Sequence, residues 1–150
     1  MFAIANQQLP GKTLDLQNAR DIDDIFGRLQ TAVEPKTDNS RNVIASQSRV
    51  FEEFSSQYKE FLQKVHSLTN LAAVVEFGRK LTDKLPLNPE PTDEQKQSLK
   101  VETMEMVSQA KSTLTDFIDK RQNEIEALQQ MIDTANKMLE DPKILRTGEL

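Results

Sequence analysis

The sequence contains no cysteine and no tryptophan, and only 4 of its 150 residues are glycine. A chain without cysteine can form no disulfide framework, thiol nucleophile or thiolate metal site. The glycines are dispersed, so there is no glycine-rich loop that could bind phosphate groups. These absences exclude several common kinds of active site.

Histidine is almost as rare, because His66 is the only one. A di-iron site in a helical bundle needs Glu-x-x-His motifs on facing helices, whereas residue 63 is Gln and there is no second histidine. Ser67 follows His66 but lies in no Gly-x-Ser-x-Gly turn. We interpret His66 as a structural or solvated residue.

An acidic cluster is formed by Asp21, Asp23 and Asp24. A calcium-binding EF-hand loop would need a glycine at its sixth position and a closing glutamate, and neither fits here. We interpret the cluster as a solvated helix face. We therefore expect no catalytic residue, no cofactor, no metal and no small-molecule substrate, and the sequence predicts a non-enzymatic protein.

Basic residues are too scattered to form a patch. The chain has 19 Lys and Arg against 24 Asp and Glu, and its longest basic runs are the pairs Arg79-Lys80 and Lys120-Arg121. Direct nucleic-acid binding requires a basic patch or stripe. We expect no direct contact with nucleic acid.

Long apolar runs are missing as well, since no stretch approaches the roughly 18 apolar residues that a transmembrane helix needs. The segment Met1–Ala5 lacks the charged region with which a cleavable signal peptide begins. We expect no membrane span, no cleavable signal peptide and an intracellular location, either cytoplasmic or nuclear.

What the chain does have is abundant charge, at 29% of its residues, mixed with 37% hydrophobic residues in helical spacing. Prolines interrupt this spacing and divide it into three pieces. We expect one helical domain at 13–141, after a flexible segment at 1–12 and before a tail at 142–150. Its helices are expected at about 14–33, 41–84 and 93–140.

The second of these helices carries the strongest signal. Ten positions alternate in steps of three and four residues, which is the pattern of a coiled-coil seam. They are Ile44, Gln47, Phe51, Phe54, Tyr58, Phe61, Val65, Leu68, Ala72 and Val75.

The third helix has a clear predicted start, because Thr92 and Gln95 fit a capping box. Its seam runs from Leu99 to Leu139 less regularly. Gln47 and Arg121 are polar residues at seam positions. We interpret them as residues that set the helix register, and contact with a partner remains the alternative.

Two helices of similar length joined by a short proline-rich connector predict an antiparallel hairpin. The expected fold is all-α: a long coiled-coil hairpin with the shorter N-terminal helix packed at its open end, forming a three-helix bundle there. A bare two-helix arm would remain at the connector end.

That arm carries more apolar side chains than two helices can cover, and such a surface usually marks an interface. The predicted protein-binding residues are Leu71, Val74, Phe77, Leu81, Val101 and Met104. The alternative is that the first helix, or the apolar segment with Phe2, Ile4 and Leu9, covers these residues.

We expect the protein to be a structural or adaptor subunit of a larger helical assembly, binding its partners through coiled-coil packing. The partners would be other helical proteins, or the chain itself, in a four-helix or larger bundle. The alternative is a helical chaperone or escort that holds a partner before assembly or export.

Overall fold

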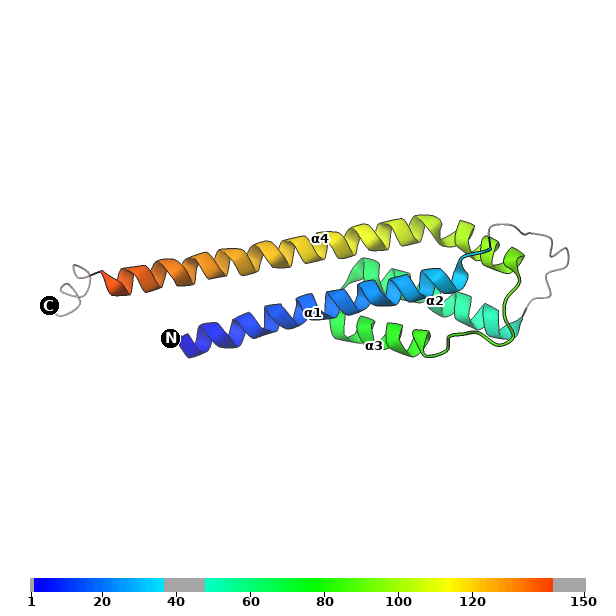
Figure 1. Cartoon of the computed structure of the whole chain (residues 1–150), viewed down its shortest axis with the longest axis horizontal. Helices are drawn as coiled ribbons and strands as arrows, with labels where there is room; N and C mark the ends of the chain where they lie inside the picture. Colours follow the sequence, from blue (N-terminus) through cyan, green and yellow to red (C-terminus); the bar gives the residue numbers. More distant parts are fainter. Residues whose placement is uncertain (1, 37–47, 142–150) are drawn as a thin grey trace. The chain divides into compact units, whose positions relative to one another are not determined.

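The computed structural model describes residues 2–36 and 48–141, which contain four α-helices and no strand (Figure 1). The predicted all-α fold is confirmed. The predicted tail at 142–150 and the polar seam residue Gln47 lie outside the described residues. The helices are α1 (Phe2–Val33), α2 (Arg49–Ser67), α3 (Leu71–Thr82) and α4 (Asp93–Glu140).

The chain divides into two compact units. The first comprises residues 17–116 and holds α2, α3 and the adjoining parts of α1 and α4. The second comprises residues 1–16 and 117–150, so its described part consists of the beginning of α1 and the end of α4.

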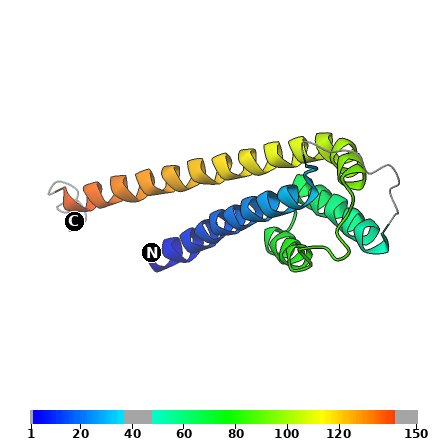
Figure 2. The same ribbon diagram turned by 45° about the vertical axis from the view of Figure 1, so that its right-hand side comes forward.

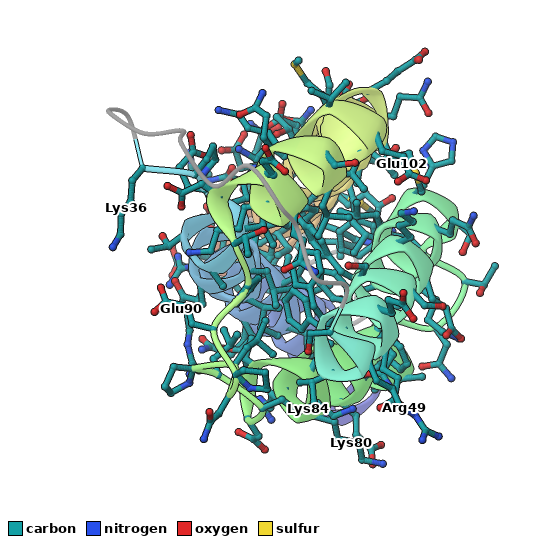
Figure 3. All side chains as sticks on the ribbon, turned by 90° about the vertical axis from the view of Figure 1, so that its right-hand side faces the viewer. Lys36, Arg49, Lys80, Lys84, Glu90 and Glu102 are labelled. Carbon is teal, nitrogen blue, oxygen red and sulfur yellow. The ribbon has the colours of Figure 1, made fainter. Side chains whose placement is uncertain are left out.

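In the unit 17–116, segments of all four helices surround a common apolar core. Figure 2 shows α1, α2 and α3 from a second direction. Figure 3 shows side chains filling the space between the ribbons, with charged groups such as Lys80 and Glu90 at the periphery. Side chains exposed by less than 2% include Ile22, Phe26, Leu29, Phe54, Tyr58, Phe61, Leu62 and Val65.

The helix predicted over 41–84 is not continuous, which corrects the expected long hairpin. Its chain turns at residues 68–70, where Leu68 adopts a left-handed conformation with φ 41° and ψ 43°. Asn70 then starts α3, and its side-chain oxygen accepts a hydrogen bond from the Ala73 N–H at 3.1 Å. A left-handed leucine costs about 1 kcal/mol. Burial of the apolar faces of both helices offsets this cost.

The turn also changes which seam positions face inward. From Phe51 to Val65 the predicted seam residues are buried, as expected. Beyond the turn the seam residue Ala72 is exposed and the seam residue Val75 is buried, and Leu71 and Val74, which lie outside the predicted seam, are buried as well. A continuous heptad could not produce this change, because it keeps one stripe on one side of the helix.

Gly78 allows α3 to approach its neighbours closely. A Cβ atom added to Gly78 would lie 2.7 Å from Cε1 of Phe61 in α2 and 2.9 Å from Cδ1 of Ile25 in α1. Phe61 also packs edge-on against Phe26, with 5.6 Å between the ring centroids. Three helices therefore meet at Gly78 without room for a methyl group.

The first helix begins earlier than predicted, at Phe2 rather than near residue 14. A proline inside a helix removes one backbone hydrogen bond but does not oblige the helix to end. Pro10 is therefore a weaker stop signal than the prolines at 86, 89 and 91, which do lie between α3 and α4.

The predicted start of α4 is confirmed in detail. Gln95 Oε1 accepts a hydrogen bond from the Thr92 N–H at 2.9 Å, and Thr92 Oγ1 accepts one from the Gln95 N–H at 3.1 Å. This is the reciprocal capping box that the sequence indicated.

Two glycine substitutions test the three-helix contact. We expect Gly78→Ala to lower the free energy of unfolding by about 1–3 kcal/mol, because the added methyl group overpacks the core. Gly27→Ala is the matched control: a Cβ there meets nothing within 4 Å. Removing a helical glycine at Gly27 should raise the free energy of unfolding by about 0.5–1 kcal/mol. Urea denaturation measures both, and a stabilising Gly78→Ala would contradict the packing described.

The turn between α2 and α3 depends on its cap. We expect Asn70→Ala to lower the free energy of unfolding by about 1 kcal/mol, because the first turn of α3 loses a hydrogen-bond acceptor. Asn70→Asp keeps an acceptor and should be close to neutral. Thr69→Ala, at an exposed neighbour that does not cap the helix, is the control. Equal effects of Asn70→Ala and Thr69→Ala would rule out the cap.

Burial of Tyr58 makes the stability of the core depend on pH. Its side chain is 1% exposed and its ring stacks on Phe54 with 6.1 Å between centroids. Burial disfavours the tyrosinate and raises the pKa of Tyr58 to about 12. Since the folded state favours the neutral phenol, this stabilisation is complete below the unfolded pKa of about 10 and is lost as pH rises through the folded value.

We therefore expect the free energy of unfolding to fall by up to about 3 kcal/mol between roughly pH 10 and pH 12 through this group. Tyr58 is the only tyrosine and the chain has no tryptophan, so its ionisation can be followed by the near-ultraviolet absorbance of tyrosinate. Tyr58→Phe should reduce the alkaline loss. An ordinary tyrosine titration in the folded protein would show that the ring is not buried as described.

Candidate protein-binding surface

Three of the six predicted protein-binding residues are in the core. Leu71, Val74 and Leu81 are exposed by 9%, 4% and 2%. Their expected exposure is wrong, because the turn at 68–70 folds α3 against α1 and α2. The alternative was that the first helix packs over these residues. Ile25 of α1 lies close to Gly78 of α3, as that alternative requires.

Phe77 is half-buried, and the Lys64 ammonium lies 5.5 Å from the centroid of its ring. Val101 and Met104 lie on α4 and are exposed by 61% and 58%. The six residues thus form no single exposed surface. Binding by Val101 and Met104 stays a prediction.

The more extensive apolar surface is at the end of α4. Leu114 is the last buried residue of this helix, and no side chain from Thr115 to Glu140 is buried. Met131 is exposed by 67%, Met138 by 52% and Leu139 by 53%.

These exposed residues form a stripe with others nearby. Leu128, Met131, Ala135 and Met138 follow one another in steps of three, four and three, so they lie on one side of the helix. Leu139 lies beside them. We call these five residues the α4 stripe. Ile125 and Ile132 border the stripe and are half-buried, so one flank of it is already partly covered.

Sequence reasoning found part of this stripe and missed the rest. Leu128, Ala135 and Leu139 belong to the predicted seam, but the seam was expected to be covered by the preceding helix. Met131 and Met138 are not seam residues. The signal that reveals them is their position next to Ile132 and Leu139, which makes the apolar face wider than a two-helix seam requires.

Arg121 makes two contacts with neighbours in its own helix. Its Nη1 donates a hydrogen bond to Glu124 Oε2 at 2.7 Å, and its guanidinium lies 5.1 Å from the centroid of the Phe117 ring. Setting of the helix register by Arg121 stays a prediction, because these two contacts do not test it.

The polar residues weighed as sites in the sequence make structural contacts. His66 is exposed, and its Nδ1 lies 3.0 Å from Oγ1 of Thr113 on α4. Asp21 accepts a hydrogen bond from Arg79 Nη2 at 2.8 Å, which connects α1 to α3. Among the described residues, no three His, Asp or Glu side chains are grouped as a metal site.

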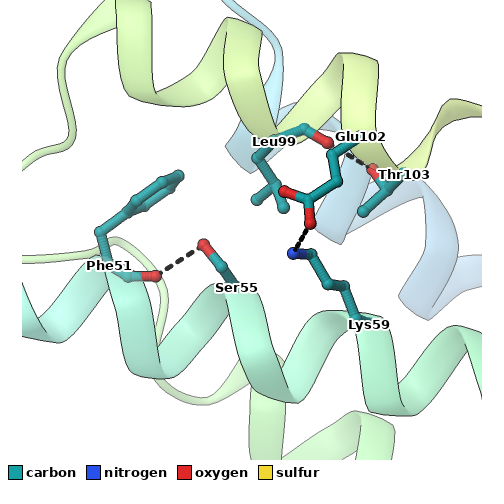
Figure 4. Close-up of polar contacts among 6 residues, drawn as sticks. All are labelled: Phe51, Ser55, Lys59, Leu99, Glu102 and Thr103. Atoms are coloured by element: carbon teal, nitrogen blue, oxygen red, sulfur yellow. Dashed lines mark hydrogen bonds and ion pairs between the residues drawn. The ribbon is translucent and has the colours of Figure 1, made fainter.

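A groove of about 760 Å³ lies between α2 and the beginning of α4. Phe51 and Leu99 line it, and an ion pair joins Lys59 to Glu102 (Figure 4). The Ser55 hydroxyl in this groove donates to the Phe51 carbonyl at 2.7 Å. The polar groups described in this groove thus contact each other: the ion pair joins α2 to α4, and the Ser55 hydroxyl is bound to the backbone of its own helix.

A second groove, of about 980 Å³, lies between α1 and the proline-rich connector. Gly27 and Ala32 line it on α1, and Leu85, Pro86 and Leu87 line it on the connector. Lys96, at its edge, forms an ion pair with Glu90 at 3.6 Å. Charges of both signs border this groove, so it selects no particular ligand charge.

No helix in the described part of the chain combines the length and apolar character that crossing a bilayer requires. The chain matches no protein-family model, no curated protein and no solved structure.

Proposed function

We propose that this protein is a non-enzymatic structural or adaptor subunit that binds a helical partner through the α4 stripe. The observation that supports this is the exposure of Met131, Met138 and Leu139 on one side of a helix. Apolar side chains gathered on one side of an exposed helix are typical of an interface.

The energetics favour a partner. Burying a large apolar side chain contributes about 1.5–3 kcal/mol, and four of the five stripe residues are leucine or methionine. Part of this gain is offset by the lost freedom of the associating molecules.

The chemistry of the stripe suits a helix as partner. Its residues repeat in steps of three and four, so a second helix can place its own apolar residues between them. Methionine adapts its shape to different neighbours. The net charge of −5 and the scattered basic residues favour a protein partner over nucleic acid.

The alternative is a helical chaperone or escort that holds its partner only before assembly or export. The two methionines of the stripe favour this alternative, because flexible methionine side chains can repack against different partners and so allow one partner to replace another. The two functions differ in the lifetime of the complex. A stoichiometric complex that persists through purification indicates a subunit, and displacement by unlabelled client indicates an escort.

Site-specific photo-crosslinking tests the proposed surface. A benzophenone amino acid replaces Met131 in the full chain, and the same amino acid at the exposed neighbour Gln130 is the matched control. We expect a defined adduct from residue 131 in cells, and little from residue 130, because only residue 131 lies in the stripe. Absence of an adduct, or equal yields from the two positions, would contradict the proposal.

A further inference from the structure

We infer that two copies of this chain can form a dimer by exchanging α3 and α4, with residues 68–70 as the hinge. In the exchanged dimer α2 and α3 straighten into one continuous helix, and α3 and α4 of each copy pack against α1 and α2 of the other. The α4 stripe plays no part in holding this dimer together. Three features of the chain favour the exchange: a strained turn, a local sequence that suits a straight helix, and the faces that α2 and α3 bury.

The hinge holds a backbone conformation that leucine rarely adopts. Leu68 has φ 41° and ψ 43°, although its N–H still donates a helical hydrogen bond to the Lys64 carbonyl at 2.9 Å. The left-handed conformation is unfavourable for leucine, because it brings Cβ too close to the following carbonyl oxygen. Only Thr69 and Asn70 separate Leu68 from α3. A short connection under strain favours domain exchange, because opening it releases the strain.

The sequence at the hinge is compatible with a continuous helix. Residues 49–77 contain neither glycine nor proline, and the seam spacing continues through Leu68 to Ala72. In a straight helix the N–H groups of residues 69–73 donate to the carbonyl groups four residues earlier. These bonds replace the cap that the Asn70 side chain provides to α3 in the monomer. Straightening therefore leaves no helix start without hydrogen-bond acceptors.

A straight helix cannot bury the apolar faces of α2 and α3 in the same core. Phe54 and Val74 are both buried in the monomer, and they are 20 residues apart in the sequence. At 3.6 residues per turn they would lie on nearly opposite sides of a continuous helix. The apolar face of α3 would thus be exposed in an opened single chain, and covering it requires another molecule.

A second copy fits that exposed face because it carries the same site that α3 and α4 occupy in the monomer. Gly78 can lie against Phe61 of the other copy, as it does within one chain. Polar contacts that can form again between copies are Asp21–Arg79, Gln57–Lys84, Lys59–Glu102 and Glu34–Lys100. The exchanged dimer keeps these contacts and loses the two strained turns. Dilution favours the monomer, since its two halves are tethered to each other.

Refolding at different concentrations tests whether the exchange occurs. The full chain is unfolded in urea, refolded at low and at high concentration, and analysed by size-exclusion chromatography with light scattering. We expect monomer from dilute refolding and a dimer fraction from concentrated refolding. The dimer should revert to monomer slowly on dilution, because reversal requires the helices to separate and repack. Absence of a dimer at every accessible concentration, or a dimer that equilibrates rapidly with monomer, would overturn the inference.

Spin labels distinguish an exchanged dimer from a side-by-side dimer. One batch of chain is labelled at Gln57→Cys and another at Lys84→Cys, two positions joined by a hydrogen bond in the monomer. The batches are unfolded together, refolded at high concentration, and the dimer is isolated. We expect labels on different chains to show the same short distance as a doubly labelled monomer. A dimer without this distance, such as one formed through the α4 stripe, would overturn the exchange.

Substitutions at Leu68 test the hinge itself. Leu68→Gly removes the strain from the turn and weakens the continuous helix, so both effects favour the monomer. Leu68→Ala is the matched control, because it also shortens the side chain but keeps the strain and has high helix propensity. The dimer of Leu68→Gly should be weaker than that of Leu68→Ala by at least about 100-fold. Far-ultraviolet circular dichroism shows that both variants fold, and dimers of equal stability would overturn the inference.

Discussion

The meeting of three helices at Gly78 is the contact on which the arrangement of the unit 17–116 depends. The absence of a side chain at Gly78 lets α3 lie against Phe61 and Ile25. This approach is possible only because the chain reverses at Leu68 and starts a new helix at Asn70. The left-handed Leu68 and the missing side chain at Gly78 are therefore both needed for this approach. Burial of the apolar face of α3 offsets the conformational cost of both residues.

Folding α3 back also determines which apolar surfaces remain exposed. Apolar residues of α3 such as Leu71 and Val74 become part of the core instead of extending along α4. The end of α4 continues beyond Leu114 without a buried side chain, and Met131 is among its most exposed apolar residues. The packed core and the exposed apolar stripe thus lie in different stretches of the chain: residues 17–116 hold the core, whereas residues 128–139 carry the stripe.

The sequence predicted the parts of the fold that local signals specify. Proline positions and the Thr92 capping box gave α4 its correct bounds, and three- and four-residue spacing identified the buried positions of α2. The turn at Leu68 was missed because it contains neither glycine nor proline, and the heptad pattern continues through it. Its left-handed residue is a leucine, whose type does not mark this conformation in a sequence, and its N–H donates a hydrogen bond to the Lys64 carbonyl at 2.9 Å. The predicted surface was therefore placed on α3 and the beginning of α4, and Met131 was overlooked because it is not one of the predicted seam residues.

A distance between α2 and α3 tests the reversal at residues 68–70 most directly. Lys84 Nζ donates a hydrogen bond to Gln57 Oε1 at 2.6 Å, although 27 residues separate them. In a continuous helix these positions would be about 40 Å apart. The chain has no cysteine, so Gln57→Cys and Lys84→Cys accept a pair of spin labels without further changes. The reversal predicts a distance well below the continuous-helix value, and a distance near about 40 Å would contradict it.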